Sequence, residues 1–428
     1  RPDWWVTHNG TFEHIETWGM GRDLDFYSYD IYPGFYHPRD GVYANAARLS
    51  GTAAATGTFV VLEQQSGAGG QSNFLLATPE PGQMRLWSWQ SIAHGADGIL
   101  HFRWRTCRYG AEMHWYGVLD HDNVRRRRYE ELAREGAEFK RLMPGIKGAP
   151  PRVDIGILTD LDQEHFWSTM SHGLPGPYEQ QRALFDALGR RHYAVGMVDA
   201  SDRLESYKAL IIPSFVKVDP EFDARLRAFV EQGGILLATA QTGTRDVNNH
   251  KIDTTPPGGG LPDLFGLHVI EWGTMVDEPV NLGFSDQPGP APVVYEIPEV
   301  SGAEAVVTWR STRGTGIAHQ ADGHAALTRH DFGKGQAWYL ASLAVEQTAD
   351  ALVACLVDQW PITPLASAHP EVEIAVRETD ESSYCFVLNH TTESQAVANL
   401  PAGIELLTEQ PVDGSIELGP YEVAVIRV

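Results

Sequence analysis

One glutamate stands at the end of a short apolar segment, where a carboxylate can do chemistry. The run Thr58-Phe59-Val60-Val61-Leu62 precedes Glu63 without any polar alternation, which predicts a strand buried on both faces of a parallel sheet. Parallel α/β folds collect their functional side chains at the carboxyl ends of such strands. Burying an unpaired charge there would be costly, so we interpret Glu63 as a functional residue.

Polar and aromatic residues follow each of four predicted strands, at 4–8, 24–29, 58–62 and 99–104. They are His8-Asn9, Asp30 with Tyr32-Pro33, Glu63-Gln64-Gln65 and Arg103-Trp104-Arg105. Parallel strands would bring all four groups to one rim. Sugar hydroxyls need hydrogen-bond donors and acceptors, while the apolar face of a sugar rests on aromatic rings, so this mixture favours a carbohydrate site. The alternative is that these are ordinary polar loop residues.

Helix-compatible segments at 12–21, 42–55 and 81–96 separate these strands, and Pro81 suits a first helical turn. Alternating strands and helices predict a parallel sheet with right-handed crossovers. The basic run 125–128 opens another helix-like stretch, with Tyr129, Leu132, Ala133 and Leu142 at helical spacing. We interpret that run as a solvated helix face.

The overall composition excludes several functions. The net charge of −23, from 56 acidic against 33 basic residues in 428, argues against nucleic-acid partners. The apolar runs are too short to span a membrane, and no signal peptide opens the chain. Three widely spaced cysteines predict no disulfide framework and a reducing, cytoplasmic location. The 17 histidines show no metal-binding spacing, so we expect neither a metal nor another cofactor.

Six segments together resemble glycoside hydrolase family 42, the β-galactosidases, in their order and spacing. The segments are 8–9 (His-Asn), 29–33 (Tyr-Asp-Ile-Tyr-Pro), 62–67 (Leu-Glu-Gln-Gln-Ser-Gly), 81–87 (Pro-Gly-Gln-Met-Arg-Leu-Trp), 93–98 (Ala-His-Gly-Ala-Asp-Gly) and 102–105 (Phe-Arg-Trp-Arg). The resemblance continues to the end of the chain. It implies a (β/α)8 TIM barrel, of which the four strands would be strands five to eight.

The resemblance also implies roles for particular residues. Glu63 matches the family's catalytic nucleophile, Tyr32 the tyrosine near it, and Glu112 a glutamate that binds galactose hydroxyls. Many members place a tryptophan eight positions after the nucleophile and a histidine three after the sugar-binding glutamate. Those positions hold Gln71 and Trp115 here, with His114 one step earlier. The full set of expected substrate-binding residues is Asn9, Tyr32, Gln71, Arg103, Glu112, His114 and Trp115.

A retaining glycosidase needs a second carboxylate roughly 5 Å from the nucleophile as its acid/base. In the family this is the glutamate of an Asn-Glu pair after strand four, and the sequence contains no Asn-Glu dipeptide. Glu13 and Glu16 fall in a predicted helix, and Glu80 is interpreted as a helix-start charge. We therefore expect the chain to be the C-terminal part of a larger enzyme, or one chain of a split one, and inactive alone.

A second α/β pattern follows a predicted linker at 145–151. Strands are expected at 153–158, 194–198, 209–212 and 235–240, and helices at 178–190 and 220–232, in a flavodoxin-like arrangement. Class I glutamine amidotransferases share that fold but need a cysteine nucleophile, and none lies between Cys107 and Cys355. The family resemblance implies instead a trimerisation role, hence a homotrimer. The loop 241–260 would be either a mobile surface loop or an arm that covers a neighbour's barrel rim.

From residue 371 the pattern alternates, which predicts a small antiparallel β-sandwich acting as a structural cap. The predicted domains are thus 1–150 (second half of the barrel), 151–364 (trimerisation) and 365–428 (sandwich). The implied activity is retaining hydrolysis of terminal β-D-galactosides or galactose-containing oligosaccharides through Glu63. Two alternatives stay open: a related glycosidase such as an α-L-arabinopyranosidase, and a non-catalytic sugar-binding or assembly subunit.

Overall fold

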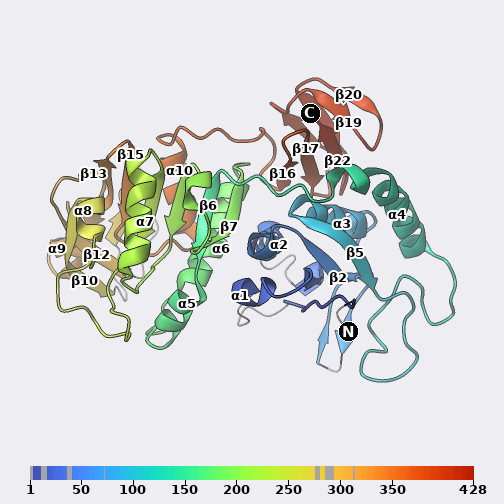
Figure 1. The fold of residues 1–428 in the computed structure, drawn as a ribbon, viewed down its shortest axis with the longest axis horizontal. Helices are drawn as coiled ribbons and strands as arrows, with labels where there is room; N and C mark the ends of the chain where they lie inside the picture. Colours follow the sequence, from blue (N-terminus) through green and yellow to red (C-terminus); the bar gives the residue numbers. More distant parts are fainter. Residues whose placement is uncertain are drawn as a thin grey trace. The chain divides into compact units, whose positions relative to one another are not determined.

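The computed structural model describes residues 3–10, 17–35, 41–71, 73–274, 280–284, 294–311 and 314–428. The chain forms two compact units (Figure 1). The first contains residues 1–153, 188–196 and 363–428, and the second contains 154–187 and 197–362. Within the described residues, no helix has the length and apolar character needed to cross a membrane.

Three parallel strands in the order β1-β2-β5 carry the candidate site of the first unit. They are β1 (Tyr27–Ile31), β2 (Phe59–Gln65) and β5 (Ala96–Phe102). The connecting helices are α2 (Tyr43–Thr56) and α3 (Gln83–Ala93), followed by α4 (Arg127–Ile146). Three of the four predicted strands are thereby confirmed, as are the helices expected at 42–55 and 81–96. Short elements complete this part: α1 (Thr17–Gly21), η1 (Pro33–Phe35), β3 (Gly70–Gln71) and β4 (Phe74–Leu75).

The predicted strand at 4–8 is wrong. The backbone there runs beside β1, where the Ser28 amide donates to the His8 carbonyl at 3.2 Å, but only Asn9 forms a bridge, with Ser28. Trp4 and Trp5 are 64% and 84% exposed, so the apolar pattern did not reflect burial. Residues 11–16 of the helix expected at 12–21, including Glu13 and Glu16, lie outside the described residues.

The C-terminal segment shares a core with the barrel-like part. Its larger antiparallel sheet, β16-β17-β22-β19-β20, buries Phe386 and Val425 in the same cluster as Phe59 and Trp89. Successive side chains of a strand point to opposite faces, so Val387 joins a second core closed by the sheet β18-β21. The strands are β16 (Val372–Glu378), β17 (Ser383–Asn389), β18 (Gln395–Ala398), β19 (Gly403–Glu405), β20 (Gln410–Val412), β21 (Ser415–Leu418) and β22 (Val423–Arg427).

Every residue of α3 is buried, because this helix lies between β2 and β5 on one side and β16 and β17 on the other. The predicted linker at 145–151 is part of this packing rather than a free connection. Helix α4 continues to Ile146, and the carbonyl of Ala149 accepts a hydrogen bond from the Arg377 side chain at 2.6 Å. The Gly-Pro composition did not reveal these contacts because their partners lie more than 200 residues away.

The second unit contains an eight-stranded sheet in the order β11-β13-β14-β15-β9-β8-β6-β7. Strands β15, β9, β8 and β6 are parallel neighbours, which confirms the predicted α/β pattern. The predicted strands and helices are observed as β6 (Ile155–Thr159), β7 (Val195–Asp199), β8 (Ala209–Ile212), β9 (Ile235–Thr239), α6 (Pro177–Gly189) and α7 (Pro220–Glu231). Asp219 caps α7 by accepting the amides of Glu221 and Phe222, and Pro220 occupies its first turn.

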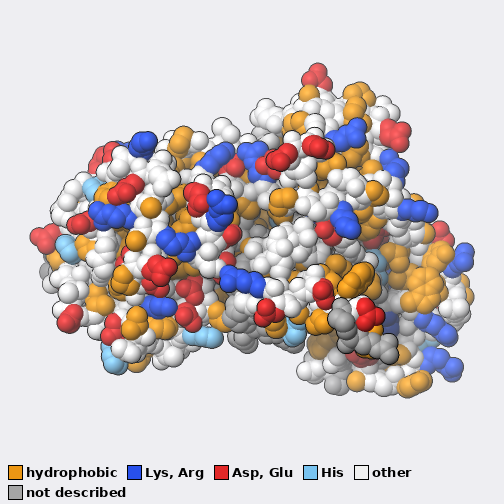
Figure 2. Space-filling model, in the orientation of Figure 1, with side chains coloured by type: hydrophobic (Ala, Val, Ile, Leu, Met, Phe, Trp, Pro, Cys, Tyr) orange, Lys and Arg blue, Asp and Glu red, His pale blue; other side chains and the backbone are white. Residues whose placement is uncertain are grey.

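The rest of the second unit was not predicted from the sequence. Antiparallel strands extend the sheet beyond β15, and β10 pairs with β12 in a separate ribbon. These elements are α5 (Leu161–Ser168), α8 (Leu261–Phe265), β10 (Leu267–Thr274), β11 (Val280–Leu282), β12 (Val294–Val300), β13 (Glu304–Ser311), α9 (Ile317–Ala321), β14 (Ala325–Phe332), β15 (Gly335–Leu340), η2 (Leu204–Ser206) and α10 (Glu346–Val357). The face shown in Figure 2 mixes acidic, basic and apolar side chains.

Candidate active site

Glu63 lies near the carboxyl end of β2 and is half-buried. The phenol of Tyr32, just beyond the end of β1, donates a hydrogen bond to its Oε2 atom. Burial raises the pKa of Tyr32 well above its ordinary value, and the hydrogen bond to Glu63 and the nearby negative charges of Glu63, Asp30 and Glu112 raise it further. The phenol therefore stays protonated and remains a donor to the carboxylate.

Asp30 pairs with Glu63 in the register of β1 and β2, so two carboxylates sit side by side on neighbouring strands. Burial raises the pKa of Asp30 to about 6; the charge of Glu63 also raises it, and the hydrogen bond from Asn9 lowers it. Its Oδ1 atom is buried and has no hydrogen-bond partner among the described residues. The sequence places Asp30 among the polar residues expected at the rim, but Asp30 was not among the expected catalytic or substrate-binding residues.

The loop after β5 brings an arginine and a second glutamate to the same place. Arg103 forms an ion pair with Glu112, contacts the Cys107 sulfur, and lies over the Phe102 ring at 4.3 Å. Glu112 is near enough to Tyr32 for its charge to raise the pKa of the phenol. Arg103 and Glu112 therefore lie in the same polar cluster as Glu63.

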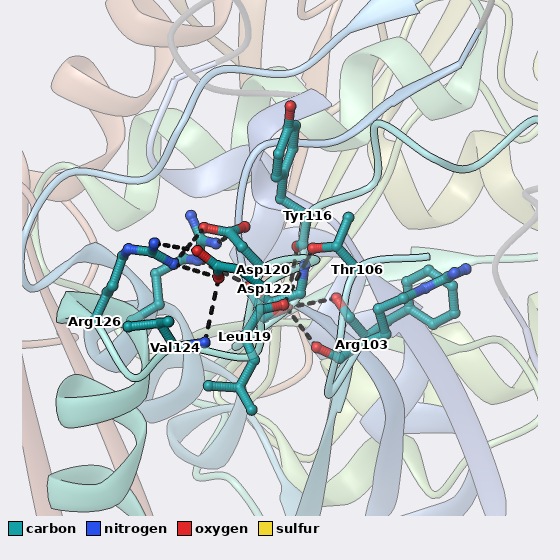
Figure 3. A network of polar contacts seen from close by, with 12 residues as sticks. Arg103, Thr106, Tyr116, Leu119, Asp120, Asp122, Val124 and Arg126 are labelled. Carbon is teal, nitrogen blue, oxygen red and sulfur yellow. Dashed lines mark hydrogen bonds and ion pairs between the residues drawn. The ribbon is translucent and has the colours of Figure 1, made fainter. Parts of the chain in front are cut away.

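Many backbone contacts fix the shape of this loop (Figure 3). The Thr106 amide and hydroxyl both donate to the Leu119 carbonyl, at 2.9 and 3.1 Å. The Arg126 guanidinium donates to both oxygens of Asp122, which lowers the pKa of Asp122. Ser66, three residues after Glu63, donates to the Phe102 carbonyl at 2.7 Å. The loops after β2 and β5 are thus joined.

Aromatic rings surround Tyr32. Trp115 lies edge-on to Tyr32 with centroids 5.0 Å apart, and Phe35, Phe74 and Phe102 also contact Trp115. Trp115 is only 7% exposed, so in this structure it packs against Tyr32 instead of presenting an open face. The cluster fixes the Tyr32 ring while its hydroxyl reaches Glu63.

The structure therefore brings together five of the predicted residues: Tyr32, Glu63, Arg103, Glu112 and Trp115. Asn9 is exposed and joins them through its hydrogen bond to Asp30. Gln71 and His114 are exposed on the joined loops, where the Tyr116 amide donates to the Ala68 carbonyl at 2.8 Å. Arg105, expected at the rim, instead donates to the His121 carbonyl at 2.7 Å.

The cluster offers a half-buried carboxylate with a fixed donor, a second carboxylate with a raised pKa, and an arginine–glutamate pair beside aromatic rings. These groups suit a reaction in which a carboxylate attacks a polar, hydroxyl-rich substrate. Among the described residues, no group of three histidine, cysteine, aspartate or glutamate side chains is arranged to hold a metal ion.

Three family models match successive parts of the chain. They are described as β-galactosidase (residues 1–142), β-galactosidase trimerisation domain (154–362) and β-galactosidase C-terminal domain (371–428). Among curated relatives, β-galactosidase BgaA of Clostridium cellulovorans is 27% identical over 418 residues, covering 95% of this chain and 61% of its own length. β-Galactosidase BgaH of Haloferax lucentense is 30% identical, covering 96% of this chain and 62% of its own length.

Solved structures show the same similarity over the whole chain. The β-galactosidase of Bacillus circulans sp. alkalophilus superposes with a TM-score of 0.87 at 25% identity, covering 100% of this chain and 64% of its own. The β-galactosidase of Halorubrum lacusprofundi gives a TM-score of 0.85 at 27% identity with the same coverage. The chain thus spans a little over three-fifths of the length of the relatives it matches.

Proposed function

This chain belongs to glycoside hydrolase family 42, and on that premise we propose that it is part of a retaining β-galactosidase whose nucleophile is Glu63. The observation that carries the proposal is the hydrogen bond from the Tyr32 phenol to a half-buried glutamate at the carboxyl end of a parallel strand. A carboxylate that is held in one orientation is what covalent glycosidase chemistry requires of its nucleophile.

In the proposed reaction, the Glu63 carboxylate attacks the anomeric carbon of a terminal β-galactoside. The bond to the leaving oxygen breaks as the bond to Glu63 forms, giving a glycosyl-enzyme ester with inverted configuration. Water then displaces Glu63 with a second inversion, so the product keeps the β configuration. Tyr32 would orient the attacking carboxylate, because its own proton stays in place.

The other groups would hold the sugar. Glu112, oriented by Arg103, would accept hydrogen bonds from galactose hydroxyls, and Asn9 would act through Asp30 or on the sugar directly. Gln71 and His114 are exposed and available to contact substrate. Trp115 would support the site by packing against Tyr32.

The acid/base that protonates the leaving oxygen would be the glutamate of an Asn-Glu pair on a segment outside these 428 residues. Three points support this: the absence of that dipeptide, the family membership, and the fraction of the relatives' length that the chain spans. We also propose that the enzyme is a homotrimer assembled through 154–362, because that segment matches a trimerisation domain. We propose that the three domains comprise residues 1–150, 151–364 and 365–428.

Azide rescue tests the assignment of Glu63. In the full-length enzyme, Glu63→Ala should abolish hydrolysis of nitrophenyl β-galactoside. Azide should then restore turnover by attacking from the vacant side, and the product should be the α-galactosyl azide. Glu112→Ala is the matched control: it should weaken substrate binding but give no azide product. Restored turnover with β-azide product, or no loss of activity in Glu63→Ala, would contradict the proposal. A parallel assay with nitrophenyl α-L-arabinopyranoside would define the sugar preference.

A further inference from the structure

The second unit contains a pocket at the carboxyl edge of its parallel strands. The chain passes from β6 to β7 on one side and then to β8 and β9 on the other, so the strand order reverses between β6 and β8. Open α/β sheets bind ligands outside the carboxyl ends of their strands, at such a reversal. Here a pocket of about 390 Å³ is formed mainly by the segments that follow β6 and β9, with Trp272 from β10. This volume suits a small molecule.

Backbone conformation at this edge is unusual. Ser214 follows β8 with φ of 48°, and Gln241 follows β9 with φ of 71°. Residues other than glycine rarely adopt this left-handed backbone conformation, and those that do cluster at ligand-binding and active sites. Gln241 lines the pocket, and its backbone amide and side-chain amide both donate to Glu296 at 2.9 Å. Gln241 is therefore held in place by Glu296, while its side-chain oxygen has no donor among the described residues.

The charged side chains that line the pocket are cationic. Arg245 is buried and donates to the carbonyls of Phe166 and Met170 and to Asn249. These bonds leave the Nε proton and one Nη2 proton without an acceptor in the described structure. Lys251 lies 5.1 Å from the Trp272 ring centre. Burial and the nearby charge of Arg245 lower the pKa of Lys251, while the charge of the buried Glu296 raises it. Among the described residues, no aspartate or glutamate lines the pocket, although the chain carries a net charge of −23.

Indole and carboxamide groups complete the lining. Trp167 is buried, whereas Trp272 is 40% exposed and offers its ring to the pocket. Asn248 adds a carboxamide of the kind that binds hydroxyl groups, whereas the Asn249 carboxamide is engaged with Arg245, Phe166 and Thr169. An indole ring can support the apolar face of a pyranose.

We propose that this pocket binds a small anionic sugar, with its carboxylate or phosphate between Arg245 and Lys251 and its ring against Trp272. The two cations supply the charge-assisted hydrogen bonds that an anion takes, and the Asn248 carboxamide matches a ring hydroxyl. The site is separate from Glu63 and does not depend on the proposed hydrolase function.

Calorimetric titration of the full chain tests this site. Galacturonate and galactose 6-phosphate are the probes for the carboxylate and phosphate forms, with neutral galactose and inorganic phosphate as comparisons. At least one anionic sugar should bind with Kd of about 1 mM or tighter, and more tightly than either comparison. The same Kd in a Glu63→Ala background would separate this pocket from the catalytic site.

Lys251→Gln should weaken binding of the anionic sugar about tenfold or more, because one charge-assisted contact is lost. Lys140→Gln, on an exposed face of α4, is the matched control and should leave the Kd unchanged. Trp272→Leu, a change at a part-exposed side chain, should weaken the sugar but not inorganic phosphate. Equal binding by Lys251→Gln and the parent chain, no binding of either sugar, or inorganic phosphate binding as tightly as the sugars would overturn the proposal.

Discussion

Replacing Tyr32 with phenylalanine removes one hydroxyl and leaves its surroundings in place. The ring should stay where it is, because Trp115 holds it at 5.0 Å and Phe35 and Phe102 at 6.2 and 6.4 Å between centroids. The single loss is the hydrogen bond to the Glu63 carboxylate. A hydrogen bond to a charged group contributes about 1.5–3 kcal/mol, which corresponds to roughly a tenfold to hundredfold fall in kcat/KM.

The pH dependence gives a second, independent signature. A carboxylate that loses a hydrogen-bond donor has its charged form destabilised relative to its neutral form. The acid limb of kcat/KM should therefore move to higher pH. The assay is hydrolysis of nitrophenyl β-galactoside by the full-length enzyme across a pH series.

Tyr207→Phe is the matched control, since Tyr207 also donates to a carboxylate, that of Asp202 at 3.0 Å, but in the second unit. It should leave both kcat/KM and the acid limb unchanged. If Tyr32→Phe kept kcat/KM within about twofold of the parent enzyme, with the same acid limb, the reasoning that Tyr32 orients the nucleophile would be refuted.

Three further predictions concern stability. Arg377→Met should lower the free energy of unfolding of the first unit by about 3–5 kcal/mol in urea, because its buried guanidinium donates to the carbonyls of Ala149, Ile92 and Ala96 and pairs with Asp97 at 2.8 Å. The control Arg141→Met removes an exposed ion pair with Glu409 and should cost less than about 1 kcal/mol. Equal losses of stability in the two variants would contradict this prediction. Burial raises the pKa of Glu373, but hydrogen bonds from His390 and His94 outweigh burial and lower the pKa to about 2. Ionised Glu373 should therefore stabilise the fold above pH 4.5, and this stabilisation should be lost as the pH falls toward 2. Glu373→Gln should flatten the dependence of the melting temperature on pH, and an unchanged slope would refute this prediction. Asp30 should change stability with pH in the opposite direction. Because the pKa of Asp30 is raised to about 6, stability should fall as the pH rises from 3.8 to 6. Asp30→Asn should remove that fall, and a stability curve parallel to that of the parent chain would contradict the raised pKa.

The parts of the fold that the sequence predicts are those with strong local patterns. The run before Glu63 becomes β2, and the apolar segment 209–212 becomes β8 with the same bounds. Helix α7 could be placed within one residue because Pro220 and Gly233-Gly234 mark its two ends. In each case a few neighbouring residues determine the outcome, so no distant contact is needed to identify the element.

The parts that could not be predicted depend on distant partners. Asp30 becomes a neighbour of Glu63 through the strand register, and its raised pKa results from burial. Glu373 accepts hydrogen bonds from Gln90 and His94, which lie more than 270 residues earlier in the chain. Trp115 was expected at the sugar, and only the packed structure reveals its contact with Tyr32.

Trapping the proposed glycosyl-enzyme intermediate tests most directly whether Glu63 is the nucleophile. The full-length enzyme would be treated with a 2-deoxy-2-fluoro-β-galactoside carrying an activated leaving group, digested and analysed by mass spectrometry. The fluorine slows release from the nucleophile, and the leaving group needs no acid. We expect one fluorogalactosyl group on Glu63, absent in Glu63→Gln. A label on Asp30 or Glu112 instead would contradict it.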